Sequence, residues 1–131
     1  MSSDTILILE PDLLARHPLA EYLRQCGYRV LEATTTAEAR QFLSHPSYSV
    51  DIVFAAVDMP DENGFALAAW IHRTLPSVEV VLAGTVAHAA EKAGDLCEQG
   101  PALSKPYDHQ LLLNEIRRLR ASRRQPRDTP A

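Results

Sequence analysis

Charged side chains follow the ends of short apolar runs in this 131-residue chain. Glu10 and Asp12 come after the first run, and Asp58 comes after the third. Lys105 comes after the last. Clustered carboxylates hold hard cations such as Mg²⁺, and a lysine binds the oxygens of an anion. If the runs are parallel strands of an open sheet, their carboxyl ends form one edge, where ligands bind. The sequence therefore predicts one polar site at that edge.

The apolar runs alternate with segments of helical periodicity. This alternation is typical of parallel strands joined by crossover helices. The central runs are apolar on both faces, as expected for strands that helices cover on both sides. We expect a doubly wound, five-stranded parallel sheet with helices on both faces. The candidate strands are residues 5–9, 29–33, 52–57, 78–82 and 102–104.

Five helices are predicted between and after these strands. Thr35 and Glu38 have the spacing of a capping box, and Asp108 is a candidate N-cap of the last helix. Pro76 is expected to end the third helix. The apolar stripes are Ala15, Leu19, Leu23 and Cys26; Ala39, Phe42 and Leu43; Ala68, Ile71 and Leu75; the segment 86–99; and Leu112, Ile116 and Leu119.

The composition is that of one globular domain. Of the residues, 46% are hydrophobic and 23% are charged, which suits a single ordinary core in a soluble chain. No apolar run reaches membrane-spanning length, and the first residues do not resemble a secretory signal, so we expect a cytoplasmic protein. Cys26 and Cys97 lie far apart without a metal or redox spacing, and we expect both to be reduced packing residues.

Charge is distributed unevenly along the chain. The net charge is −4, but residues 1–110 carry seven basic and fifteen acidic groups, whereas residues 111–131 carry six arginines and two acids. The plainest interpretation is a solvated helix face followed by a disordered end. We therefore expect a domain over residues 1–121 and a basic, disordered tail over 122–131.

Four motifs stand in an order that carries a family resemblance. They are Thr5 to Asp12, Gly27 to Ala33, Asp51 to Pro60 with Asn63-Gly64 beyond, and Gly100 to Pro106. Together they resemble the receiver domain of response regulators, the CheY-like, flavodoxin-like fold of two-component (phosphorelay) signalling, over about Thr5 to Ala121. In that family, the residue three before the Met-Pro pair is an aspartate that takes a phosphoryl group from a histidine kinase. Here it is Ala56, which has no oxygen nucleophile.

The resemblance implies a degenerate acidic pocket as well. Glu10 matches the first acidic position, but Pro11 falls where the family has its main metal ligand and offers no carboxylate. Asp12 lies one residue later and is expected to cap the first helix. Asp58 matches a position that offers a backbone carbonyl. We therefore expect no Mg²⁺ binding and no other cofactor.

The switch positions differ from the family pattern in the same direction. Gly84 stands at the switch hydroxyl position, and Thr85 is expected to cap the next helix instead. Ala102 replaces the switch aromatic residue. Lys105 is retained, with two readings open: a salt bridge to Glu10 or Asp58, or a residual anion site. The resemblance implies a cis peptide before Pro106, whereas X-Pro bonds are usually trans.

A contact surface is predicted on the fourth helix, fifth strand and last helix, because receivers commonly use this face. Charged stripes at helical spacing give an independent reason. Opposite stripes suit a two-fold homodimer or a partner protein, although both stripes can equally be solvated or pair within one chain. The stripes are Glu91, Asp95 and Glu98, and Arg117, Arg120 and Arg124.

Three functions remain open. The favoured one is a stand-alone, non-enzymatic receiver-like module that acts by protein contact with a histidine kinase or downstream effector, independently of phosphorylation. The second is an active phosphoacceptor that uses Asp58 or Asp61. The third is a nucleic-acid-associated protein that uses the arginine-rich end. The histidines lack metal spacing, and no phosphate-binding loop or nucleophile elbow is present.

Overall fold

A computed structural model describes residues 4–102 and 104–124. Its sheet has four parallel strands in the order β2-β1-β3-β4. The strands are β1 (Thr5–Leu9), β2 (Arg29–Ala33), β3 (Ile52–Ala56) and β4 (Glu79–Ala83). The predicted bounds hold for β1 and β2 and shift by one residue at β3 and β4. The doubly wound parallel sheet is confirmed, with one strand fewer than expected.

Within residues 4–102 and 104–124, five helices complete the fold. They are α1 (Leu13–Gln25), α2 (Thr36–Ser44), α3 (Gly64–Thr74), α4 (Val86–Gln99) and α5 (His109–Arg124). Thr35 caps α2 by accepting the Glu38 N–H at 3.1 Å, as the capping box predicts. Asp108 caps α5 by accepting the Gln110 N–H at 2.9 Å. These two N-cap hydrogen bonds therefore lie at the helix starts that the sequence predicts.

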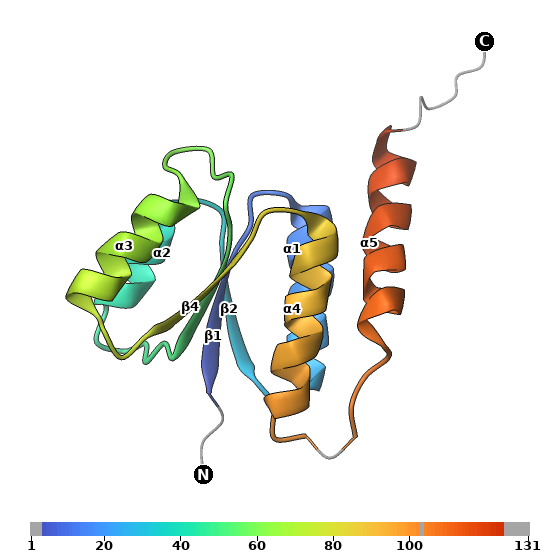
Figure 1. The fold of residues 1–131 in the computed structure, drawn as a ribbon, viewed down its shortest axis with the longest axis horizontal. Helices are drawn as coiled ribbons and strands as arrows, with labels where there is room; N and C mark the ends of the chain where they lie inside the picture. The colour runs from blue at the N-terminus through green and yellow to red at the C-terminus, as the bar shows by residue number, and fades with distance from the viewer. Residues whose placement is uncertain (1–3, 103, 125–131) are drawn as a thin grey trace.

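The helices cover both faces of the sheet, as expected (Figure 1). The side chains of β1 alternate between two cores. Ile6 and Ile8 pack with α1 and α4, whereas Leu7 and Leu9 pack with α2 and α3. All four side chains are fully buried. Both faces of β1 are thus apolar, which explains the continuous apolar run in the sequence.

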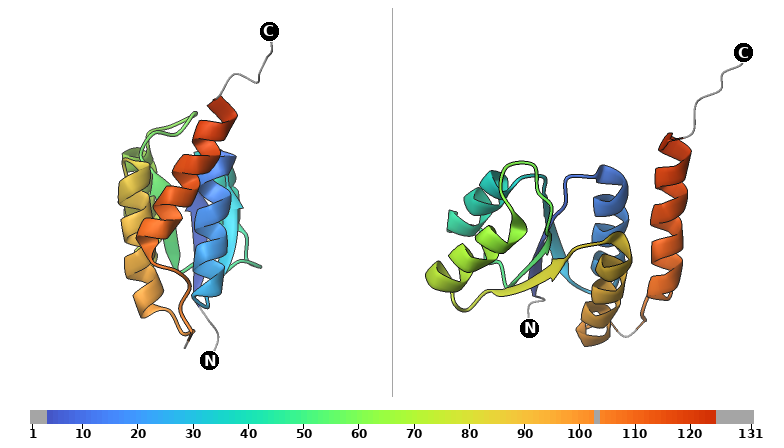
Figure 2. Two further views of the ribbon diagram at one scale, coloured as in Figure 1. Left: turned by 90° about the vertical axis from the view of Figure 1, so that its right-hand side faces the viewer. Right: turned by 45° about the horizontal axis from the view of Figure 1, so that its top comes forward.

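Helix α5 forms an outer layer. It packs across α1 and α4 and lies outside them (Figure 2). Leu112, Leu113 and Ile116 are the buried residues through which it joins the α1–α4 core. Of the apolar stripe predicted in the last helix, Leu112 and Ile116 are therefore buried against helices, whereas Leu119 is half-buried.

The expected fifth strand is a correction. Within the described part of the segment 102–104, which excludes residue 103, the backbone is not a strand. The N–H of Ala102 instead donates to the Cys26 carbonyl at 3.2 Å, so the chain leaving α4 turns toward the end of α1. Gly27 has a φ of 101°, and Pro101 lies so close that a Cβ on Gly27 would be 2.7 Å from it. A glycine here permits this approach.

The cysteines are a second correction. Cys26 and Cys97 form a disulfide, rather than remaining reduced, and both are buried. Their separation of 71 residues gave no sequence signal. They meet because Cys26 caps the end of α1 and Cys97 lies in the last turn of α4.

Two further expectations concern the C-terminal part. The described chain contains no cis peptide bond, so the peptide between Lys105 and Pro106 is trans. Helix α5 continues to Arg124, so residues 122–124 of the predicted tail are helical, and residues 125–131 lie outside the described residues. None of the described helices is both long enough and apolar enough to span a membrane.

Candidate functional site

A cavity of about 490 Å³ opens at the carboxyl ends of the parallel strands. Its floor and walls come from strand ends, from the loops after β3 and β4, from the first turn of α4 and from α5. The lining residues with a predicted role are Glu10, Ala56, Asp58, Gly84, Thr85, Arg117 and Arg120. The structure therefore brings Glu10 and Asp58 of the predicted acidic pocket to this cavity and adds two arginines from the last helix, whereas Pro11 and Asp12 are not among its lining residues.

Alanine side chains form part of the cavity floor. Ala56 is the last residue of β3, and Ala83 is the last residue of the neighbouring β4. The N–H of Val57 donates to the carbonyl of Ala83 at 3.2 Å, which extends the pairing of these strands just beyond Ala56. Asp58 follows in the loop and is exposed. The side chains at the two strand ends thus carry no oxygen or nitrogen.

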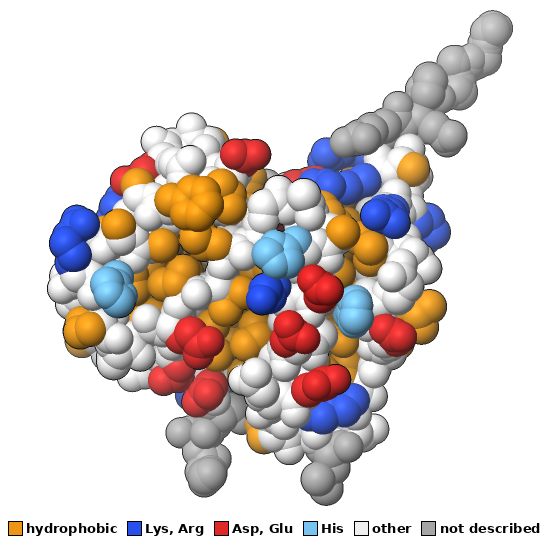
Figure 3. All heavy atoms as spheres, in the orientation of Figure 1, with side chains coloured by type: hydrophobic (Ala, Val, Ile, Leu, Met, Phe, Trp, Pro, Cys, Tyr) orange, Lys and Arg blue, Asp and Glu red, His pale blue; other side chains and the backbone are white. Residues whose placement is uncertain are grey.

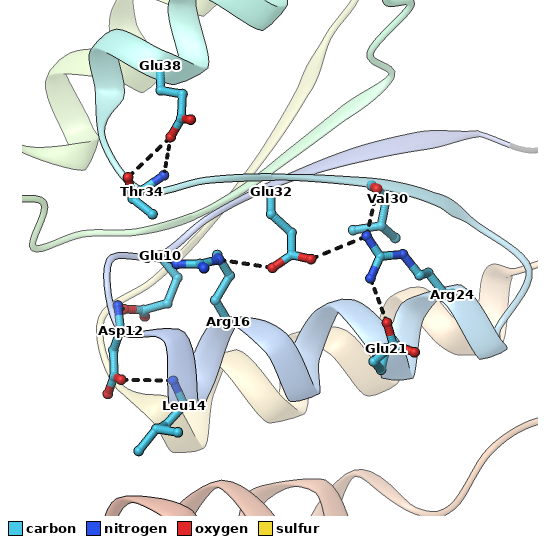
Figure 4. Close-up of polar contacts among 10 residues, drawn as sticks. All are labelled: Glu10, Asp12, Leu14, Arg16, Glu21, Arg24, Val30, Glu32, Thr34 and Glu38. Atoms are coloured by element: carbon cyan, nitrogen blue, oxygen red, sulfur yellow. Dashed lines mark hydrogen bonds and ion pairs between the residues drawn. The ribbon is translucent and has the colours of Figure 1, made fainter.

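The turn after β1 is held by its own acids (Figure 4). Glu10 Oε2 accepts the Asp12 N–H at 2.8 Å, and Asp12 Oδ1 accepts the Leu14 N–H at 3.0 Å. Arg16 Nη1 donates to the Glu10 carbonyl at 3.0 Å. Burial raises the pKa of Glu10 above its usual value, against the opposing effect of the Asp12 N–H. Pro11 is exposed and contributes no side-chain oxygen.

Asp12 also binds two arginines of α5. Arg120 Nε donates to Asp12 Oδ2 at 2.7 Å, and Arg123 Nη1 lies 3.4 Å from Asp12 Oδ1. Burial by itself raises the pKa of Asp12, but the hydrogen bonds from Arg120 and the Leu14 N–H and the charges of both arginines outweigh it and hold the pKa below its usual value. The sequence analysis predicted the cap and missed the ion pair, whose partners are 108 residues apart.

Lys105 does not form the predicted salt bridge to Glu10 or Asp58, and the alternative of a residual anion site stays a prediction. The Nζ of Lys105 donates to the Cys97 carbonyl at 2.7 Å and to the Gly100 carbonyl at 3.0 Å. The lysine therefore satisfies the carbonyl groups at the end of α4, where a cation is favourable. It does not line the cavity, and its nearest described partners are neither Glu10 nor Asp58.

Two of the three switch positions lie at the cavity, and the third lies elsewhere. Thr85 is the N-cap of α4 and accepts the His88 N–H at 3.0 Å, as the sequence predicts. Gly84 is exposed at the cavity, and a Cβ there would meet no atom within 4 Å. Ala102 is half-buried near Cys26, away from this cavity. Gly84 and Thr85 therefore line the same cavity, whereas Ala102 does not.

Asp61 serves the start of α2. Its two oxygens accept from the Thr36 N–H at 3.1 Å, the Thr36 hydroxyl at 2.9 Å and the Ala37 N–H at 3.1 Å. These bonds, led by the Thr36 N–H, lower the pKa of Asp61. Among the described side chains, no three of His, Cys, Asp and Glu gather in a way that could hold a metal ion.

The predicted contact stripes are only partly free. Glu91, Asp95 and Glu98 are exposed, and acidic side chains gather over α4 in Figure 3. Arg117 is exposed, but Arg120 pairs with Asp12 in the same chain. The side chain of Arg124 lies outside the described residues.

Comparison with known proteins agrees with this architecture. A family model of the response regulator receiver domain matches residues 6–117. The signal receiver domain of an HD domain-containing protein from Pseudomonas fluorescens has a crystal structure that is similar to this chain. The TM-score is 0.60 at 27% identity, and the match covers 94% of this chain and 93% of that one.

Curated relatives are longer than this chain. The transcriptional regulatory protein GltR of Pseudomonas aeruginosa is 31% identical over 119 residues, which cover 88% of this chain and 48% of GltR. The aerobic respiration control protein ArcA of Escherichia coli is 38% identical over 68 residues, which cover 52% of this chain and 28% of ArcA. The chain thus spans less than half the length of either relative. The family match over most of the sequence, on a parallel sheet with the expected strand-end cavity, shows that the chain belongs to the response regulator receiver domain family.

Proposed function

We propose that this receiver domain signals by protein contact and that its output is independent of phosphorylation. The observation that carries the proposal is Ala56, which ends β3 inside the strand-end cavity. A methyl group cannot attack phosphorus. The sheet, the cavity and the helices around it are retained around this position, which supports a role for the fold as a binding module, and we expect no enzymatic activity.

The donor set around the cavity also supports a domain that works without Mg²⁺. Mg²⁺ requires several oxygen ligands in a strict geometry and loses its water reluctantly. Pro11 supplies no side-chain oxygen, and both oxygens of Asp12 already accept from the Leu14 N–H and from arginines. The guanidinium of Arg120 thus supplies positive charge at this acid.

We propose that the partners are signalling proteins, either a histidine kinase or a downstream effector in the cytoplasm. The exposed acids of α4 and the exposed Arg117 of α5 support a contact through these two helices. A homodimer through the same face remains a proposal, but its charged pairing would have to do without Arg120, which pairs with Asp12.

One alternative is a phosphoacceptor at a neighbouring aspartate. Asp61 already accepts three hydrogen bonds at the start of α2, which disfavours it. Asp58 is exposed and lines the cavity, so it is the alternative acceptor that an experiment must address. The nucleic-acid hypothesis loses support because Arg118, Arg120 and Arg123 pair with carboxylates of the chain itself.

Intact-mass spectrometry after incubation with acetyl phosphate and Mg²⁺ tests the proposal. The wild-type protein should gain no phosphoryl group, and Ala56→Asp should gain little. Ala56→Asp combined with Pro11→Asp should gain a phosphoryl group, which shows that the assay works on this fold. An adduct on the wild-type protein that disappears in Asp58→Asn would establish the alternative and overturn the proposal.

A further inference from the structure

We propose that the Cys26–Cys97 disulfide is a redox-sensitive tether that sets the position of α4, and through α4 the position of α5 and of the cavity wall. The tether would give this domain an input that does not require phosphorylation. The inference rests on the proposed function only in taking α4 and α5 as the contact surface.

The disulfide lies in a cluster of contacts at one end of the molecule. It joins the end of α1 to the last turn of α4, across 71 residues of sequence. The Tyr28 hydroxyl donates to the Leu96 carbonyl at 2.6 Å, and Lys105 Nζ donates to the Cys97 carbonyl at 2.7 Å. Ala102 N–H donates to the Cys26 carbonyl. The end of α1, the end of α4 and the segment after α4 are thus fixed together around one covalent bond.

Helix α4 has a small apolar contact of its own. Its buried side chains are Ala89, Ala90, Ala93, Leu96 and Cys97. Stabilisation by burial grows with the apolar area removed from water, and an alanine removes little. Helix α1 buries larger side chains, including Leu19, Tyr22 and Leu23. The position of α4 therefore depends on the disulfide more than the position of α1 does.

The tether is physically connected to the cavity at the other end of α4. Val86, in the first turn of α4, lines the cavity. Helix α5 packs on α4 and α1 through Leu112 and Ile116, and it contributes Arg117 and Arg120 to the same cavity. A change in the position of α4 must therefore change the surface against which α5 packs. In this proposal α4 and α5 move together between two positions, and the disulfide at Cys97 favours one of these positions over the other.

The chemistry is thiol–disulfide exchange with a dithiol. A thiolate of the dithiol attacks one sulfur of the pair and releases the other cysteine as a thiolate that takes a proton. The second thiolate of the reductant then attacks the mixed disulfide and releases the second cysteine. The cysteine pair gains two electrons and two protons, and the dithiol becomes a disulfide. Oxidation reverses these steps with a disulfide as oxidant.

Burial links this reaction to the movement of α4. The residues Cys26 and Cys97 are at most 3% exposed, so a reductant reaches them only when the structure around the bond opens, and we take the last turn of α4 as the part that opens. In a compartment kept reducing by thiols, disulfides are usually transient and redox-sensing. The chain has two cysteines, so any response to a reductant reports on this pair.

Hydrogen exchange followed by mass spectrometry on the full chain tests the inference. The protein is compared after oxidation with oxidised glutathione and after reduction with dithiothreitol, with the redox state of each sample verified by alkylation. In the reduced protein, amides of α4 and of Gly100 and Ala102 should exchange at least about tenfold faster, whereas amides of α2 and α3 should change by less than about twofold.

The control is the double variant Cys26→Ser, Cys97→Ser. It should exchange like the reduced wild-type protein and should not respond to dithiothreitol. Three results would overturn the inference: two free thiols after oxidation, equal exchange in both states, or equal acceleration of all helices, which would make the bond a general staple. The wild-type comparison remains decisive if the double variant does not fold. Acetyl phosphate takes no part, so failure here leaves the phosphorylation test unaffected.

Discussion

At the scale of single residues, Asp12 joins the start of α1 to α5 through several contacts of one side chain. One carboxylate accepts the Leu14 N–H, pairs with Arg120 and lies near Arg123. Its side chain is only 15% exposed, so these partners must offset the cost of burying the charge. A surface salt bridge is usually worth little, but this one is partly buried and also caps a helix.

Removing the guanidinium group of Arg120 should therefore destabilise the fold. We expect Arg120→Met to lower the free energy of unfolding by about 1–3 kcal/mol, because it leaves a half-buried carboxylate with a weaker partner. Arg117→Met is the matched control on the same helix and should change stability by less than about 0.5 kcal/mol. Urea unfolding measures both. Equal effects would show that the Asp12–Arg120 pair contributes nothing particular.

Acid should remove the contribution of Asp12. Its folded pKa lies below the ordinary value of 3.8, so the favourable contribution is fully present above that value and is lost as the pH falls through the folded pKa. Asp12→Asn keeps a good capping residue but removes the charge. The variant should lose less stability than the wild-type protein between about pH 5 and about pH 2. If the unfolding free energies of the variant and the wild-type protein fall in parallel over this pH range, the loss of stability in acid does not come from Asp12.

Magnesium should leave the wild-type protein unaffected. Glu10 accepts the Asp12 N–H, and Asp12 accepts the Leu14 N–H and pairs with Arg120, so we expect too few oxygens to remain for an octahedral ion. Millimolar Mg²⁺ should not change the melting temperature of the wild-type protein. The variant with Ala56→Asp and Pro11→Asp should show a saturable rise, which serves as the positive control. A rise in the wild-type protein would refute the expectation.

At the scale of elements, the loop between β3 and α3 illustrates what holds the cavity in place. Gly64 begins α3 and donates its N–H to the Val57 carbonyl at 2.8 Å. A Cβ on Gly64 would lie 2.6 Å from the Ala56 carbonyl oxygen and 3.0 Å from the Val57 Cα. Both neighbours are backbone atoms, so the start of α3 and the end of β3 are fixed against each other.

Two glycine substitutions compare a tightly packed position, Gly64, with an open one, Gly84. We expect Gly64→Ala to cost about 1–3 kcal/mol of unfolding free energy, because the backbone on both sides must shift. Gly84→Ala, in the loop after β4, places a Cβ that meets no atom within 4 Å and should stay within about 0.5 kcal/mol. Thermal or urea unfolding distinguishes them, and a neutral Gly64→Ala would show that the approach is not tight.

The elements also show which signals a sequence carries. The bounds of β1, β2 and α4 were predictable because periodicity and capping residues such as Thr85 are local. The absence of the fifth strand was not predictable, because the Ala102 N–H donates to the carbonyl of Cys26, which lies far away in sequence. The disulfide, the place of Lys105 and the Asp12–Arg120 pair likewise depend on which chain ends meet in space. Strand-end positions can be read from a pattern, but the partner of a long side chain cannot.

At the scale of the whole molecule, two ends are connected through the same pair of helices. The disulfide and Lys105 fix α4 at one end, and Asp12 binds α5 at the other, beside the strand-end cavity (Figures 1 and 2). Between them, α5 rests on α1 and α4. The exposed face of these helices is the surface that we propose for partners, and its position is set by internal bonds.

Under the proposed function, this receiver does not respond to the phosphoryl chemistry of its family. Two-dimensional ¹H–¹⁵N NMR of the wild-type protein, recorded before and after addition of Mg²⁺ and acetyl phosphate, tests it most directly. We predict that the amide signals of the cavity loops and of α4 and α5 stay in place. A saturable displacement of signals around Ala56 and Gly84 that extends into α4 and α5 would show that the domain does respond to phosphoryl chemistry.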